Sequence, residues 1–164
     1  MSTRSLIAYQ DPTTKMINAI YCHNNGDPLG VGKCLYQNYQ DIIKVKKLIK
    51  LGDISILGPN PNQDAMIKKY GFLWDSREFM NLPWEQQLRY SKNHQGTLAY
   101  HRDRGEELNI YTCRYLKELK QIAEECDAEF IYLFRKQEIW QWKYTTEKFY
   151  KWYDLAQKIR KKKQ

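Results

Sequence analysis

Four short segments are richer in hydrophobic than in polar positions, and we interpret them as two β-hairpins. Ser5–Gln10 and Met16–Cys22 flank an Asp-Pro pair, which is typical of a turn. Glu129–Phe134 and Ile139–Tyr144 form a similar pair near the C-terminal end, and the second of these carries aromatic residues at every other position. These segments therefore predict one hairpin at each end of the chain.

Apolar residues with helical spacing predict three main helices. The clearest begins after Asp41, a good N-cap residue, and its apolar positions recur every three to four residues. Thr112 is the predicted cap of a second helix, and residues 149–159 form a third. Gly32–Gln37 also looks helical. The lysines at positions 44, 46, 47 and 50 fall on the side of the first helix opposite its apolar stripe, which predicts a solvated face.

The pattern loosens over residues 53–96, where prolines interrupt it. Asp64–Tyr70 and Pro83–Tyr90 are each typical of a short helix. We interpret this stretch as an irregular insertion, too short to build its own core, within a single domain of residues 1–164. Because strands and helices do not alternate strictly, the order predicts an α+β fold: a mainly antiparallel sheet of about five strands with helices packed on one face.

Composition adds limits on the class of protein. Of the 164 residues, 42% are hydrophobic, which is enough for a core. No apolar run approaches the roughly 20 residues that a membrane span needs, and the first residues do not resemble a signal peptide. The four cysteines have no close spacing, so we expect reduced thiols and a cytosolic protein. No motif indicates a cofactor, and the composition is compatible with either a monomer or a homo-oligomer.

The formal net charge of +8 favours an anionic partner. Part of this charge lies in a basic tail at residues 158–164, which we interpret as a solvated helix end. Without the tail the domain is only mildly basic. Charge alone therefore indicates no dedicated nucleic-acid surface.

The first candidate site is the glycine-rich loop after the second predicted strand. Such a loop can direct backbone N–H groups at an anion, or it can simply connect a strand to a helix. The text GDPLGVGK departs from the phosphate-binding P-loop motif, because Asp27 replaces a glycine and Cys34 replaces Ser or Thr. A nucleotide triphosphatase is therefore disfavoured. The candidate residues here are His23, Gly26, Gly30, Gly32 and Lys33.

The second candidate site is the polar run after a predicted strand at Thr97–Tyr100. Its cations are of the types that bind phosphate or carboxylate, unless they pair with the acidic residues beside them. Both candidate segments have a strand ending in Tyr followed closely by His. If the two strands are neighbours, His23 and His101 would emerge at one edge of the sheet, near Arg4. The candidate residues of this second segment are Tyr100, His101, Arg102 and Arg104.

Other chemistry has less support. Cys22 and His23 adjoin, but neighbouring strand residues point to opposite faces, so we expect no metal site. No motif supports a Cys–His nucleophile. Trp140, Trp142 and Tyr144 could stack on the bases of a nucleic acid, but we interpret them as core between the hairpin and the last helix.

Four segments of the chain stand out together: STRSLIA (Ser2–Ala8), the pattern IYCHxxGxPxxVGK (Ile20–Lys33), LIKLGDISILG (Leu48–Gly58) and AYHRDRGE (Ala99–Glu106). In these segments the sequence resembles a family of small accessory proteins encoded by tailed phages and prophages. The resemblance implies a protein made in the host cytoplasm, with no established activity to transfer. Relatives usually have His-Trp-Asp-Gly after the cysteine, whereas Asn24 and Asn25 stand here.

These observations favour a binding protein over an enzyme. The leading hypothesis is sequestration, without turnover, of a phosphate-bearing ligand such as a nucleotide signal of host defence. The alternative is direct inhibition of a host defence protein. A nucleic-acid-binding protein and a phosphodiesterase using His23 and His101 stay as further alternatives.

Overall fold

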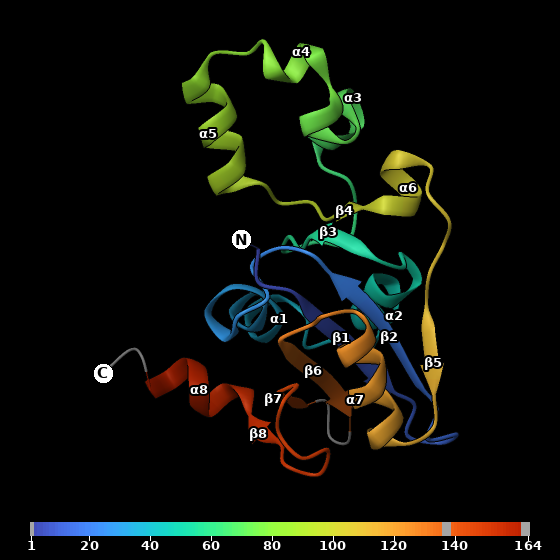
Figure 1. Ribbon diagram of the computed structural model, residues 1–164. Helices are drawn as coiled ribbons and strands as arrows, with labels where there is room; N and C mark the ends of the chain where they lie inside the picture. The colour runs from blue at the N-terminus through green and yellow to red at the C-terminus, as the bar shows by residue number, and fades with distance from the viewer. Residues whose placement is uncertain (1, 136–138, 162–164) are drawn as a thin grey trace.

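One mixed β-sheet forms the centre of the molecule in the computed structural model, which describes residues 2–135 and 139–161. Its strand order is β4-β3-β2-β1-β6-β7-β8, and β5 pairs with β2 beside this path (Figure 1). The strands are β1 (Ser5–Gln10), β2 (Ile17–Cys22), β3 (Ile54–Ile56), β4 (Leu98–Ala99), β5 (Tyr111–Cys113), β6 (Phe130–Arg135), β7 (Ile139–Tyr144) and β8 (Tyr153–Asp154).

Both predicted hairpins are confirmed, as the antiparallel pairs β1–β2 and β6–β7. Two pairings are parallel instead: β1 with β6, where Ser5 lies opposite Phe130, and β2 with β3. The sheet is therefore mixed and larger than the predicted five strands. Apart from Gln10, every residue of β1 is buried, because this central strand is covered on both faces.

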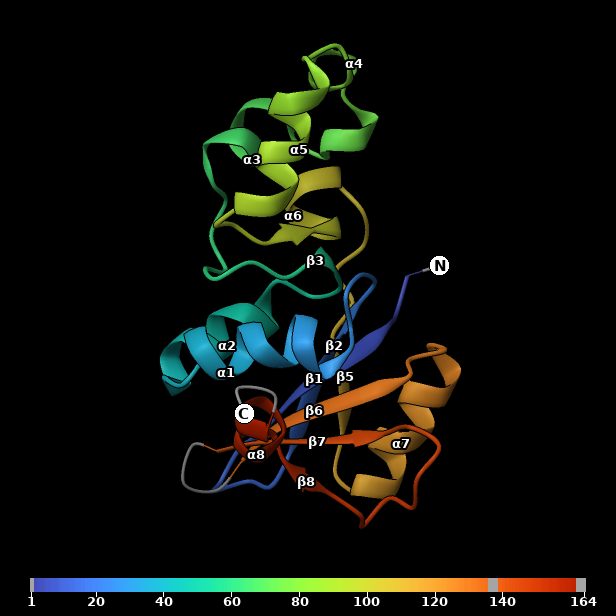
Figure 2. The same ribbon diagram turned by 90° about the vertical axis from the view of Figure 1, so that its left-hand side faces the viewer.

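Helices cover both faces of the sheet, so the prediction of one covered face is wrong. Ile7 and Ile20 belong to a core cluster beneath α1, α2 and α8, whereas Leu6 and Ala8 belong to a second cluster beneath α7 (Figure 2). The helices are α1 (Lys33–Asn38), α2 (Ile42–Lys50), α3 (Ala65–Tyr70), α4 (Arg77–Met80), α5 (Trp84–Asn93), α6 (Tyr100–Arg104), α7 (Leu116–Glu125) and α8 (Leu155–Lys161), with short helical turns η1 (Pro28–Gly32) and η2 (Leu73–Asp75).

The helix after Asp41 is confirmed as α2, and the Asp41 carboxylate accepts a 2.7 Å hydrogen bond from the Ile43 amide. Two other helix boundaries differ from the prediction. Thr112 lies in β5 and caps no helix, since α7 begins only at Leu116. Tyr153 lies in the edge strand β8, so α8 is shorter than predicted. The last three residues of the predicted basic tail, 162–164, lie outside the described residues.

The insertion forms a small helical lobe of α3, η2, α4 and α5 at one end of the molecule, beyond β3 and β4 (Figure 1). Ile67, Leu73 and Phe79 are buried there, outside both main clusters. The Phe79 ring centroid lies 5.7 Å from that of Tyr70 and 5.9 Å from that of Tyr90. These residues form a small apolar cluster inside the lobe, and the assignment of the stretch as an insertion within a single domain stays a prediction.

The aromatic face of β7 lies mostly in the core, as predicted. Trp140 and Trp142 are buried, and the Trp140 Nε1 donates a 2.6 Å hydrogen bond to the Tyr39 carbonyl. Tyr144 differs, because it is 42% exposed. Among the described residues, no helix is long and apolar enough to cross a membrane.

Candidate functional site

The glycine-rich loop between β2 and α1 already uses its backbone donors internally. The Gly26 amide donates to the Thr3 carbonyl at 2.8 Å, and the Gly30 and Gly32 amides donate to the Asp27 carbonyl at 3.0 and 3.3 Å. The Gly26 carbonyl accepts from the Tyr132 hydroxyl at 2.7 Å. These contacts support the structural interpretation of the loop, as a tight connection between a strand and a helix.

Glycine is required in this loop by close packing. A Cβ at Gly26 would lie 2.8 Å from the Arg4 carbonyl carbon, and a Cβ at Gly30 would lie 2.3 Å from the Asn25 carbonyl oxygen. Lys33 is exposed at the start of α1. The loop therefore presents one free-standing cation and no cradle of amides.

In the second candidate segment, the Arg102 guanidinium is held inside the protein. Its Nε donates to the Asp103 carboxylate at 2.9 Å, its Nη1 donates to the Pro61 carbonyl at 2.7 Å, and its Nη2 donates to the Thr97 carbonyl. The Asp103 side chain is fully buried and also accepts from the Ala99 amide. This pair ties the start and end of the helical lobe to α6.

The neighbouring residues of α6 are engaged as well. Arg104 pairs with Asp75 at 3.3 Å and lies over the Phe72 ring at 4.8 Å. Tyr100 stacks on the same ring, with centroids 5.4 Å apart. The His101 Nδ1 lies 2.7 Å from the Glu106 carbonyl oxygen. The contacts of Arg104 and Tyr100 hold the lobe and α6 together, whereas the contact of His101 lies within α6 and the loop that follows it.

The strands that precede His23 and His101 are separated by β3. β2 runs parallel to β3 and β4 runs antiparallel to it, and Cys22 and Ala99 both lie opposite Ile54. The approach of the two histidines at one sheet edge stays a prediction. The Nδ1 of His23 lies 2.8 Å from the Tyr21 hydroxyl. Arg4 lies 3.6 Å from the Asp127 carboxylate.

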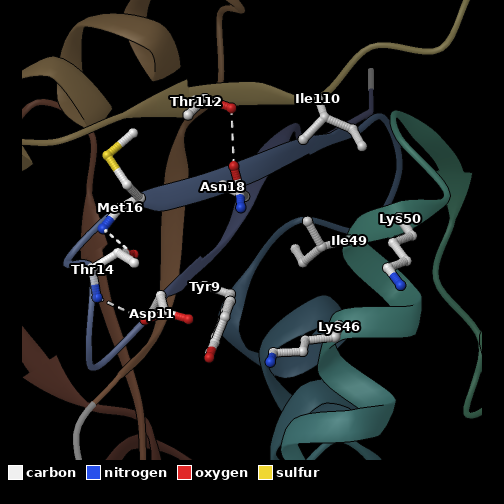
Figure 3. Close-up of a pocket in the computed structure, with 10 residues that line it drawn as sticks. All are labelled: Tyr9, Asp11, Thr14, Met16, Asn18, Lys46, Ile49, Lys50, Ile110 and Thr112. Atoms are coloured by element: carbon white, nitrogen blue, oxygen red, sulfur yellow. Dashed lines mark hydrogen bonds between the residues drawn. The ribbon is translucent and has the colours of Figure 1, made fainter.

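A groove of about 480 Å³ lies elsewhere, between the β1–β2 hairpin, α2 and β5 (Figure 3). We call it the lysine groove, after the two lysines that α2 contributes. Its residues come from three segments that are far apart in the sequence, which explains why no local motif marks it. The lining residues are Tyr9, Asp11, Thr14, Met16, Asn18, Lys46, Ile49, Lys50, Ile110 and Thr112.

Local structure fixes the walls of the lysine groove. The Asp11 carboxylate accepts hydrogen bonds from the Thr13 and Thr14 amides, both at 2.8 Å, and these bonds close the hairpin turn and hold the pKa of Asp11 below its usual range. Across the groove, the Thr112 hydroxyl donates to the Asn18 Oδ1 at 2.9 Å. The side-chain oxygen of Asn18 is thus occupied as an acceptor, which leaves the side-chain N–H₂ group of Asn18 as the donor on this wall.

The hydroxyl of Tyr9 is the most informative group in the groove. Tyr9 is 5% exposed, and its hydroxyl finds no hydrogen-bond partner among the described residues. Burial, and then the negative charge of Asp11, raise the pKa of Tyr9, so the hydroxyl stays a protonated donor at neutral pH. The Lys46 Nζ lies 5.7 Å from the centre of the Tyr9 ring.

Figure 3 shows the hydroxyl end of Tyr9 between the side chains of Asp11 and Lys46, with Lys50 one turn further along α2. Both lysines are exposed, and no ion pair engages them within the described residues. The groove therefore gathers two ammonium groups, a buried hydroxyl and an amide, which together suit an anion with several oxygen atoms.

The lysine groove was not predicted from the sequence, for two reasons. Lys46 and Lys50 were assigned to a solvated helix face, and Thr112 was assigned to a helix cap. The one usable signal was the density of lysines along α2, but only the pairing of β5 with β2 places a wall opposite them.

No protein-family model, curated protein or solved structure matches the chain significantly. The resemblance to phage accessory proteins stays a prediction. In the described part of the chain, no group of three or more His, Cys, Asp or Glu side chains is placed to hold a metal ion. All four cysteines are free, and burial raises the pKa of Cys22 to about 12.

Proposed function

We propose that the protein binds a phosphate-bearing small molecule in the lysine groove and holds it without turnover. The observation that carries the proposal is the buried, unpartnered hydroxyl of Tyr9 beside Lys46 and Lys50. A buried hydroxyl without a partner costs about 1–3 kcal/mol, so a site that keeps one is suited to a ligand that supplies the acceptor.

The chemistry of the lining supports binding over catalysis. The ten lining residues include no histidine and no cysteine. Asp11 is the single carboxylate, its pKa is lowered, and two amides of its own turn hold it. The lining therefore lacks histidine, the side chain that most often serves as a general acid or base.

The apolar side of the groove supports a ligand with more than a phosphate. Met16, Ile49 and Ile110 offer a surface for a planar or apolar part, while the Asn18 amide can donate to a ring edge. A nucleotide combines these features. The resemblance to phage accessory proteins adds the narrower proposal that this nucleotide signals in host defence and that the protein sequesters it in the host cytoplasm.

The first test is a native mass spectrum of the protein purified gently from the cells that produce it, followed by identification of any released ligand. We expect a bound mass in the nucleotide range. Calorimetric titration with AMP, ADP and inorganic pyrophosphate as probes then measures affinity directly. Lys46→Gln should weaken the tightest of these probes about tenfold, because a charged hydrogen bond to phosphate is lost.

Lys47→Gln is the matched control. Lys47 is exposed on the same helix and its loss changes the net charge equally, but it does not line the groove. If both variants weaken binding of the probe equally, the loss of affinity reflects general electrostatic attraction, and the proposed site is contradicted. Absence of binding by every probe, together with a clean mass of the bare chain, would contradict the proposed function.

One observation favours a second function, direct binding to a protein through the helical lobe. Four large apolar side chains of the lobe are solvent-exposed: Trp74 at 48%, Met80 at 48%, Trp84 at 70% and Leu88 at 37%. Exposed apolar groups gathered on one small element are typical of an interaction surface. A host protein that co-purifies with the wild type and is lost from a Trp84→Ser variant would support this alternative.

A further inference from the structure

A second pocket lies on the opposite face of the sheet from the lysine groove, on the side covered by α7. Its volume is about 530 Å³. We call it the α7 pocket. Neighbouring residues point to the two sites, since Tyr9 lines the groove and Gln10 lines the pocket. The lining residues are Gln10, Arg114, Tyr115, Leu116, Lys117, Arg135 and Phe149.

Arg135 is held in a fixed orientation in the α7 pocket. Its Nε donates a 2.8 Å hydrogen bond to the Gln141 Oε1, and its guanidinium lies 5.6 Å from the centre of the Trp152 ring. Among the described residues only the Nε of Arg135 makes a hydrogen bond, so its two Nη groups remain as donors. An arginine oriented in this way loses little conformational entropy when it binds an oxyanion.

The first turn of α7 adds further positive potential. Arg114 and Lys117 are exposed beside it. The Glu118 Oε2 accepts from the amides of Arg114 and Tyr115, at 2.9 and 3.2 Å, so the acidic group of this turn is already engaged. The amides of Leu116 and Lys117 begin the helix and have no intrahelical acceptor. The helix dipole therefore reinforces the three cationic side chains that line the pocket.

Two exposed aromatic rings complete the α7 pocket. Tyr115 is 59% exposed and Phe149 is 42% exposed. Neither ring is needed to fill the core cluster beneath α7. Exposed rings beside several cations are the combination with which proteins bind single-stranded nucleic acid, since the rings stack on bases and the cations contact phosphates.

We propose that the α7 pocket binds single-stranded nucleic acid. Tyr115 and Phe149 stack on the bases, and Arg114, Lys117 and Arg135 contact the phosphates. This site is separate from the lysine groove and does not depend on it. It also differs from the base-stacking surface considered in the sequence, because Trp140 and Trp142 are buried and cannot reach a base.

The test is fluorescence anisotropy with a short labelled oligodeoxythymidylate, titrated at several salt concentrations. Tyr115→Ala and Phe149→Ala should each weaken binding about tenfold. Tyr150→Ala is the matched control, because Tyr150 is 63% exposed and adjoins Phe149 but does not line the pocket. The Tyr150→Ala variant should bind within twofold of the wild type.

Salt dependence tests the phosphate contacts. The log of the binding constant should fall with the log of the salt concentration with a slope of about −2, and Arg114→Gln or Lys117→Gln should each reduce the slope by about 0.7. Lys46→Gln should leave the affinity for the strand within twofold, which separates this proposal from the proposed function of the lysine groove.

Four outcomes would overturn the proposal. The first is no binding of the strand at micromolar protein concentrations, and the second is equal binding of a duplex of the same length. The third is that the Tyr115→Ala and Phe149→Ala variants bind as Tyr150→Ala does. The fourth is that thymidine monophosphate competes as well as the unlabelled strand does, which would make the pocket a mononucleotide site.

Discussion

Arg102 and Lys46 carry the same charge but lie in opposite situations. Arg102 donates to a buried carboxylate and to two backbone carbonyls, so its guanidinium is saturated by the protein itself. Lys46 borders a groove, forms no ion pair among the described residues, and lies near a buried hydroxyl that has no hydrogen-bond partner there. The proposed ligand site therefore rests on unsatisfied donors rather than on the residue types that usually bind the ligand.

The largest expected effect is a loss of stability when Arg102 is removed. Arg102→Ala should lower the free energy of unfolding by about 3 kcal/mol, because it leaves the fully buried Asp103 carboxylate without its charge partner. Arg104→Ala should cost less than about 1 kcal/mol, since its pair with Asp75 is solvent-exposed. Denaturant unfolding of the two variants measures the difference. A small effect of Arg102→Ala would remove the contrast with Lys46.

A smaller effect is expected in the pH dependence of stability, and it concerns the thiol of Cys22, just before the glycine-rich loop. Cys22 is fully buried, and its pKa is raised from 9.0 to about 12. Above pH 9 the unfolded chain loses this proton while the folded protein keeps it, so stability falls as pH rises. Between pH 8 and pH 10 the loss should be about 1 kcal/mol. Cys22→Ala should show a correspondingly shallower decline, and an unchanged decline would contradict the assignment.

The smallest expected change in stability, with the clearest meaning for function, concerns Tyr9. Tyr9→Phe removes an unpartnered buried hydroxyl, so the free energy of unfolding should rise, by less than about 1 kcal/mol. The affinity for the phosphate probe should fall in the same variant. Thermal melts and calorimetry report the two quantities. A variant that is less stable would show that the hydroxyl has a partner in the protein.

The sequence predicted well those parts of the fold that depend on local patterns. The apolar run in Ser5–Gln10 and the capped stripe after Asp41 each describe one element that forms through contacts near in sequence. The short strands β3, β5 and β8 were not predicted. They have only two or three residues each, and they exist because a neighbouring strand offers hydrogen-bond partners.

The candidate site was harder to predict for a related reason. The pattern of His101, Arg102 and Arg104 has the right chemistry for an anion, but the sequence does not show that Asp103, Asp75 and Phe72 engage these side chains. Whether a charge is free depends on contacts between distant segments. The insertion supplies Asp75 and Phe72, whereas Asp103 adjoins Arg102 in the sequence. The two longer helices of the insertion were predicted, but the packing of the insertion against α6 was not.

The parallel pairing of β1 with β6 joins the two ends of the chain, because Ser5 lies beside Phe130. On the ribosome, the N-terminal hairpin therefore emerges long before the strand that completes its neighbourhood. Until nearly the whole chain has been synthesised, the apolar residues of this hairpin stay exposed or bound by a chaperone. A pairing between segments so far apart in the sequence also slows refolding. Because β1 needs β6 as its neighbour, this pairing limits how early in synthesis the sheet can form and how far the chain can be shortened.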